Sequence, residues 1–185
     1  MIVNYRGLYI FVEGDDDERF FREILLPKLR KKYNDTNIIK YAQKSKKFEY
    51  TEKFIKSIQK IRDASYIYVT DINDFQYVVT KKQKIKELIK SIDYDKIFVV
   101  IKEIESWYLA GLDSKLGKNL GIKKIPHTTD TVTKEQFYNL MPKKFDSKID
   151  FMREILKNFS IEIAKKRNKS FKYFIENVIN PSFLF

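Results

Sequence analysis

Cysteine is absent from this sequence, and histidine occurs once, as His127. The absence of cysteine excludes disulfide bridges, thiolate nucleophiles and thiolate zinc sites. A single histidine beside Pro126, with no cysteine or second histidine to join it, is a poor metal ligand and is read as structural or incidental. Oxygen donors are therefore the candidates for any metal site in this chain.

Long apolar runs are also missing, and none approaches the roughly 18 residues that a membrane-spanning helix needs. The first six residues do not resemble a secretory signal, because no cleavable apolar core precedes a small-residue site. We therefore expect a cytoplasmic protein with no membrane association. The sequence contains no Walker A motif, no Gly-x-Gly-x-x-Gly after a strand and no Gly-x-Ser-x-Gly elbow, which argues against ATP hydrolysis by this chain alone.

Acidic residues are few relative to basic ones: 25 Asp and Glu against 37 Lys and Arg give a formal net charge of +12. Such an excess favours polyanions, nucleic acid first, through counterion release. Lysine-rich surfaces also maintain solubility, so the charge alone leaves both interpretations open. The basic clusters that we expect to contact nucleic acid are Lys44, Lys46 and Lys47, and then Lys165, Lys166, Arg167 and Lys169.

Apolar residues make up 43% of the 185-residue chain, with 15 Phe and 12 Tyr, which suffices for a sizeable core. In the first half, apolar segments alternate with helix-like patterns. Strands are predicted at 8–12, 37–42, 66–70 and 96–101, and helices from Asp15 or Asp16, over about 47–63 and over 82–92. This order predicts an α/β fold with a four-stranded, mostly parallel sheet flanked by helices.

The character of the chain changes beyond Trp107, where glycines punctuate a lysine-rich region. Helices are predicted over about 133–140, 147–158 and 168–179. We interpret residues 1–112 as the α/β core and residues 113–185 as a small helical appendage packed on it.

Carboxylates and an amide follow three of the predicted strands, where open α/β sheets place their chemistry. Oxygen donors of this kind suit Mg²⁺ or Mn²⁺. A bound metal would also reverse the local charge before a phosphodiester approaches, so the pattern favours metal-assisted phosphoryl transfer. The candidate metal ligands are Glu13 after the first strand, Asp71, Asn73 and Asp74 after the third, and Glu103 and Glu105 after the fourth. Lys102 is a candidate phosphate contact.

These motifs together resemble the TOPRIM domain family, and more narrowly the small stand-alone TOPRIM-like proteins related to OLD-family nucleases. The segments that carry the resemblance are Val12 to Glu18, Asp71 to Phe75, Glu103 to Ala110 and Ser170 to Phe174. The resemblance implies a Rossmann-like fold and Mg²⁺-dependent nuclease chemistry. It further implies a role in phage defence together with a partner ATPase or effector protein.

By this resemblance Glu13 is a metal ligand or general base, and Asp71 is a metal ligand. Asn73 stands where the family has the second aspartate of Asp-x-Asp, and Asp74 is the candidate replacement. Asp17 stands where OLD-like relatives tend to have glutamate, and it is a further candidate metal ligand whose shorter side chain could reach the ion through a water molecule. Either Glu103 or Glu105 would complete a second metal position: an extended segment would place both on one face, whereas a helix beginning there would turn Glu105 elsewhere.

The sequence leads to two main hypotheses for the function and to a third, less favoured one. The first is a Mg²⁺- or Mn²⁺-dependent nuclease, or a related phosphoesterase, in which Glu13, Asp71 and Lys102 carry the reaction. The second is a non-catalytic module that binds nucleic acid or a protein partner, because the neutral Asn73 would weaken the metal site. The third is a small-molecule phosphatase.

Overall fold

Four strands form one parallel sheet in a computed structural model that describes residues 6–42 and 46–179. The strands are β1 (Gly7–Val12), β2 (Asp35–Lys40), β3 (Ala64–Asp71) and β4 (Ile97–Val100), in the order β2-β1-β3-β4. In the register of the central strand, Ile10 lies between Ile38 of β2 and Ile67 of β3. The predicted α/β class with a parallel sheet is confirmed.

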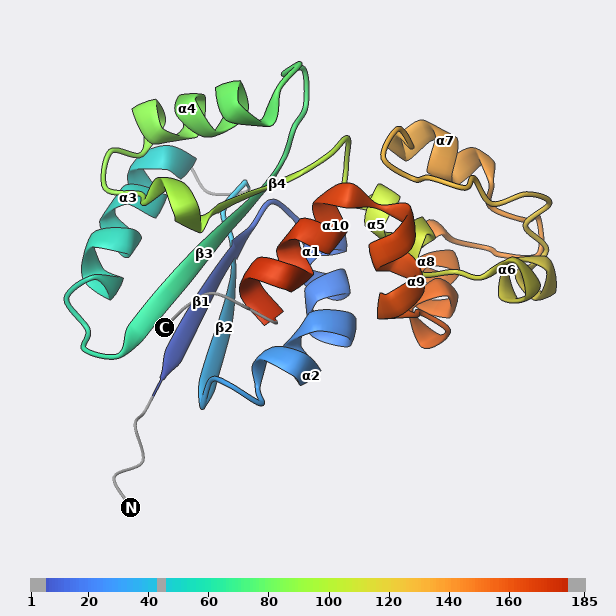
Figure 1. Ribbon diagram of the computed structural model, residues 1–185, viewed down its shortest axis with the longest axis horizontal. Helices are drawn as coiled ribbons and strands as arrows, with labels where there is room; N and C mark the ends of the chain where they lie inside the picture. Colours follow the sequence, from blue (N-terminus) through green and yellow to red (C-terminus); the bar gives the residue numbers. More distant parts are fainter. Residues whose placement is uncertain (1–5, 43–45, 180–185) are drawn as a thin grey trace. The chain divides into compact units, whose positions relative to one another are not determined.

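Helices cover the two faces of this sheet (Figure 1). On one face, Phe11 and Tyr68 belong to an apolar cluster that contains Ile55 of α3 (Lys47–Ile58) and Ile85 of α4 (Val78–Leu88). Because side chains alternate along a strand, Ile10 points to the opposite face. There Figure 1 shows α1 (Asp15–Phe20) and α2 (Leu26–Leu29).

A π-helical turn, η1 (Phe21–Leu25), lies between α1 and α2, directly before the helical turn that contains Pro27. The Leu26 N–H donates to the Phe21 carbonyl, five residues back. Proline supplies no N–H to the ladder and crowds the preceding turn, so a local change of helical pitch is the expected response.

One predicted helix boundary is wrong, because buried apolar residues at helical spacing continue beyond the end of the helix. We expected a helix over 82–92, but α4 ends at Leu88, and Ile89 takes an extended conformation with φ −126°. Ile89 and Ile92 are nevertheless fully buried. Their spacing marks burial rather than helical backbone, and periodicity alone does not separate the two.

The chain divides into two compact units, residues 1–99 and 100–185. The second unit consists of helices. They are α5 (Glu105–Ala110), α6 (Ser114–Leu120), α7 (Lys134–Asn139), α8 (Lys148–Lys157), α9 (Ile161–Arg167), α10 (Lys169–Phe174) and the π-helical turn η3 (Ile175–Ile179). The helices expected near 133–140, 147–158 and 168–179 are present, while α5, α6 and α9 are additional.

Aromatic packing holds the second unit together. The Trp107 ring lies 5.2 Å from Phe171 and 5.5 Å from Phe174, centroid to centroid, and Phe137 lies 5.3 Å from Phe151. Trp107 therefore packs in the core of this unit, as its apolar surroundings in the sequence suggest. In the part of the chain that the structure describes, no helix has the length and apolar character to cross a bilayer.

Candidate functional site

Glu13 follows β1 directly, and its carboxylate is held by side chains and backbone from two other segments. Its Oε1 accepts hydrogen bonds from Thr70 Oγ1 at 2.7 Å, from the Asp71 N–H at 3.2 Å and from the Tyr41 hydroxyl at 3.2 Å. Because β1 and β3 are neighbours in a parallel sheet, their carboxyl ends meet at one edge. The fold thus fixes the orientation of the Glu13 carboxylate.

Asp71 closes β3 and is 9% exposed. Its backbone N–H bond to Glu13 shows that the two carboxylate-bearing residues lie together, as we expected from their places after two strands. The adjacent Tyr41 hydroxyl also lies 3.1 Å from the Val69 carbonyl oxygen. Burial raises the pKa of Tyr41 well above its ordinary value, so this hydroxyl remains a hydrogen-bond donor at neutral pH.

Asn73 and Asp74 lie in an exposed turn after β3, closed by a hydrogen bond of 3.2 Å from the Phe75 N–H to the Ile72 carbonyl. Asn73 has a φ of 52°, in the left-handed region that asparagine tolerates better than most residues. Its Nδ2 donates to the Asp71 carbonyl at 3.3 Å. Turn geometry alone therefore accounts for an asparagine at this position.

Lys81 of α4 is only 6% exposed, and its Nζ lies 5.2 Å from the centre of the Phe75 ring. Burial lowers the pKa of Lys81, while the negative charges of Glu13 and Asp71 act in the opposite direction. A lysine thus lies within range of the charges of the two carboxylates, although we did not expect one there from the sequence. Its position could have been predicted from helical spacing, because Lys81 stands four residues before the buried Ile85, on the apolar face of the helix.

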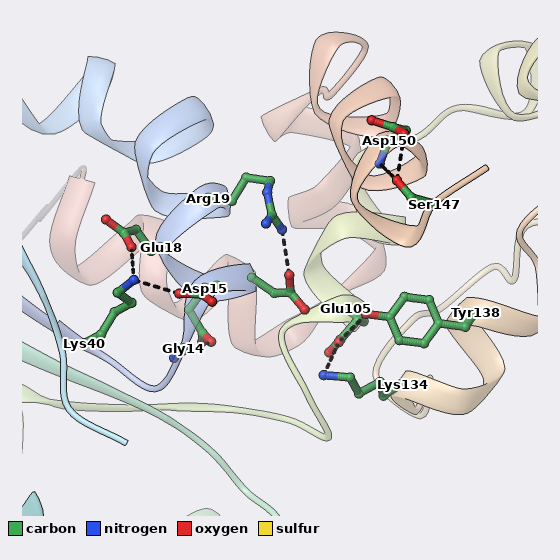
Figure 2. A network of polar contacts seen from close by, with 12 residues as sticks. Gly14, Asp15, Glu18, Arg19, Lys40, Glu105, Lys134, Tyr138, Ser147 and Asp150 are labelled. Atoms are coloured by element: carbon green, nitrogen blue, oxygen red, sulfur yellow. Dashed lines mark hydrogen bonds and ion pairs between the residues drawn. The ribbon is translucent and has the colours of Figure 1, made fainter. Parts of the chain in front are cut away.

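The acidic run after Gly14 serves largely to start α1. The Asp17 side chain is 5% exposed, and its Oδ2 accepts a hydrogen bond of 3.1 Å from the Gly14 N–H. Figure 2 shows Lys40 of β2 between two further carboxylates, with its Nζ at 2.7 Å from Asp15 and 2.9 Å from Glu18. Helix starts favour such carboxylates, and Lys40 compensates their charge.

The second unit contains the other predicted ligands, and here a helix begins at Glu105. Glu105 is 1% exposed, and its Oε1 lies 3.0 Å from Lys134 Nζ and 3.4 Å from the Tyr138 hydroxyl (Figure 2). Burial raises the pKa of Glu105. Glu103 Oε2 accepts a hydrogen bond of 2.6 Å from the Lys134 N–H. Both glutamates thus contact α7, which gives each of them a structural role.

The remaining predicted contacts are basic. Lys102 is exposed with a φ of 65°. Lys46 Nζ lies 3.7 Å from Glu49, and Lys47 Nζ lies 5.2 Å from the Phe48 ring centre. Lys44 lies outside the described residues. A cavity of the second unit is lined by the remaining predicted contacts, which lie in and after α9: Lys165, Lys166, Arg167 and Lys169.

The donor set limits what kind of metal site is possible. Among residues 6–42 and 46–179, no group of three or more His, Cys, Asp and Glu side chains is placed to hold a metal ion. Mg²⁺ is commonly bound through one or two carboxylates, with waters and substrate phosphates completing the octahedron. Glu13 and Asp71 supply the two carboxylates that such a site requires, and they do not form an all-protein cage.

No protein-family model and no curated protein matches this sequence. Among solved structures, the chain is similar to the C-terminal region of the OLD protein of Xanthomonas campestris pv. campestris. The two share 14% sequence identity, with 97% of this chain and 88% of that chain covered and a TM-score of 0.36. A likeness at this level identifies neither a family nor a function.

Proposed function

We propose that this protein is a Mg²⁺- or Mn²⁺-dependent nuclease, or a related phosphoesterase, that acts on nucleic acid phosphodiesters. The observation that carries the proposal is the pairing of Glu13 with Asp71 at the carboxyl ends of two adjacent parallel strands. The resemblance of the Val12 to Glu18 and Asp71 to Phe75 motifs to TOPRIM nucleases supports the same chemistry. The net charge of +12 favours a polyanionic substrate.

In this proposal the protein supplies orientation and charge. Thr70, Tyr41 and the Asp71 N–H fix Glu13 Oε1, so the carboxylate is preorganised and needs no reorientation during the reaction. A metal bound there would act as a Lewis acid on the scissile phosphate. Lys81 adds a fixed positive charge that favours the approach of the phosphate to an otherwise acidic edge.

The experiment compares metal binding with cleavage in matched variants. Glu13→Gln and Asp71→Asn should each weaken Mn²⁺ binding in calorimetry and lower cleavage of single- or double-stranded DNA or RNA by at least about 100-fold, roughly 2.7 kcal/mol. Far-UV circular dichroism should show an unchanged fold. Glu23→Gln is the control, because Glu23 is an exposed carboxylate in η1. Undiminished cleavage in both site variants would overturn the proposal.

A non-catalytic nucleic-acid-binding or partner-binding module is the second candidate, and the turn at Asn73 favours it. Asn73 bonds to the backbone of Asp71 and has a conformation that explains its identity without a metal. Wild-type protein that binds Mn²⁺ and nucleic acid without turnover of any substrate would support this module. Asn73→Asp is then informative, since aspartate also tolerates left-handed φ and would add a third carboxylate.

A further inference from the structure

A cavity of about 630 Å³ lies wholly within the second unit, beside α9 and α10. All nine described residues that line it are polar or charged. Five of them are cationic, namely Lys165, Lys166, Arg167, Lys169 and Lys172, and three are acidic. The volume is within the range of small-ligand sites, about 300–1,000 Å³.

The acidic lining residues already have partners, which leaves a positive surplus. Glu162 lies 3.5 Å from Lys165 Nζ, and Glu176 lies 3.9 Å from Lys172 Nζ. The third carboxylate, Asp130, accepts a hydrogen bond of 2.7 Å from the Lys169 N–H and one of 3.2 Å from the Thr128 hydroxyl.

Three cations remain without an ion pair to any described residue. They are Lys166, Arg167 and Lys169, and the Arg167 guanidinium donates instead to the Leu112 carbonyl. A concave surface with such a surplus is electrostatically complementary to a multiply charged anion.

A buried polar cluster fixes the junction that carries these cations. Asn168, 1% exposed, accepts hydrogen bonds from Ser170 Oγ at 2.8 Å and the Phe171 N–H at 2.9 Å. Its Nδ2 donates to Thr129 Oγ1 at 3.0 Å, and Trp107 Nε1 donates to Ser170 Oγ at 2.9 Å. Asn168 thus holds the backbone between Arg167 and Lys169 in place, and a preorganised site loses less entropy on binding.

We propose that this cavity binds a run of phosphate groups, supplied either by a free polyphosphate or by a nucleic acid backbone. The described residues that line the cavity include no aromatic or aliphatic side chain on which a base could stack. The cavity would therefore contact phosphate groups and would not distinguish one base from another. The site needs no part of the metal chemistry proposed for Glu13, because every residue that builds it lies in the second unit.

The test uses the full chain and two probes, inorganic tripolyphosphate and a short single-stranded oligonucleotide. Binding is measured by calorimetry and fluorescence anisotropy between about 50 and 200 mM salt. The cavity variant is Lys166→Gln/Lys169→Gln, in which both side chains are exposed and the fold should be retained. The matched control is Lys115→Gln/Lys118→Gln, which removes two exposed charges from α6 in the same unit.

We expect the cavity variant to bind tripolyphosphate at least about tenfold more weakly. If the phosphates belong to a nucleic acid, the oligonucleotide salt slope should also fall by about 1.4, the value for two lost contacts on single strands. The control should lose less than about twofold. Oligonucleotide binding that falls in parallel assigns the phosphates to a nucleic acid backbone, and loss confined to tripolyphosphate assigns them to a free ligand. Equal losses in both variants, or no tripolyphosphate binding by the wild type, would overturn the proposal.

Glu13→Gln separates this inference from the proposed function. The variant should bind tripolyphosphate in the absence of metal as tightly as the wild type, whatever happens to cleavage. Loss of metal-free binding in Glu13→Gln would contradict a cavity confined to the second unit.

Discussion

The Thr70 hydroxyl donates a hydrogen bond of 2.7 Å to Glu13 Oε1, across the ends of two neighbouring strands. Thr70 is 2% exposed and Glu13 is half-buried, so this bond is partly shielded from water. A hydrogen bond to a charged acceptor is roughly twice as strong as one between neutral groups. Thr70 therefore positions Glu13, and its contribution can be separated from that of the carboxylate itself.

Thr70→Val removes the hydroxyl while keeping the shape of the side chain. One of three donors to Glu13 Oε1 is lost, and we expect cleavage to fall about tenfold and stability by about 1–2 kcal/mol. Cleavage assays and urea titration measure the two effects. Thr51→Val is the control, because Thr51 is equally buried but donates only to the Lys47 carbonyl of its own helix. A similar loss of cleavage in the control would contradict a positioning role for Thr70.

Lys81→Gln should separate metal binding from turnover. The charges of Glu13 and Asp71 act on this ammonium, so its removal should relieve repulsion of a divalent cation bound there, and Mn²⁺ affinity should rise about two- to tenfold. Cleavage should fall, because the approaching phosphate loses a positive charge. Calorimetry and single-turnover cleavage report the two quantities.

The control is Lys82→Gln, which alters an equally buried lysine on the same helix. Lys82 Nζ lies 5.0 Å from the Tyr94 ring centre, and Asp95 is the carboxylate that acts on its pKa. Unchanged Mn²⁺ affinity in Lys81→Gln, or the same rise in Lys82→Gln, would contradict the placement of Lys81 beside the carboxylates.

The sheet could be predicted from sequence because β1, β3 and β4 are rich in apolar residues, whereas β2 has only Ile38 and Ile39 between polar residues. That pattern also brought Glu13 and Asp71 together, since parallel strands share their carboxyl edge. The partners of Glu13 could not be predicted in the same way. Tyr41 and Thr70 are common residue types in strands, and only the strand order β2-β1-β3-β4 makes them converge.

The role of Asn73 is ambiguous from the sequence for a related reason. The spacing Asp71-x-Asn73 matches a ligand pair, yet the left-handed φ of 52° and the bond to the Asp71 carbonyl depend on the turn. Asparagine is favoured in turns and at metal sites alike, so its identity does not separate them. The helix start at Glu105 is similarly ambiguous, because the preceding Lys102 to Ile104 gives no strong cap.

Glu105→Gln should change the pH dependence of stability. Burial raises the pKa of Glu105 in the folded protein, so the folded state binds this proton more tightly than the unfolded chain does. The tighter proton binding contributes to the stability of the folded protein. This stabilisation is fully present below the ordinary pKa of 4.5 and is lost as the pH rises through the pKa of the folded state. Glutamine does not titrate, so the stability cost of the substitution should shrink as the pH rises from near 4.5 towards neutrality.

Urea titrations of both proteins at matched pH values measure that cost. Glu135→Gln, an exposed glutamate in α7, should show a small and pH-independent difference from the wild type. A cost for Glu105→Gln that grows with pH would mean that the ion pair with Lys134 outweighs burial.

Asn168→Ala should destabilise the second unit. The substitution leaves the buried Thr129 hydroxyl, the Ser170 hydroxyl and the Phe171 N–H without their asparagine partner, which should cost about 2–4 kcal/mol. Trp107 is the only tryptophan in the chain, and its indole N–H bonds to Ser170, so its fluorescence in urea reports on this unit.

Asn158→Ala is the matched control, because Asn158 is half-buried and its side chain donates to the Glu154 carbonyl of its own helix. It should shift the Trp107 transition by about 1 kcal/mol or less. Equal shifts in the two variants would show that Asn168 is an ordinary helix-end asparagine. A large shift confined to Asn168→Ala, with tripolyphosphate binding weakened below the transition, would tie the buried cluster to the geometry of the basic cavity.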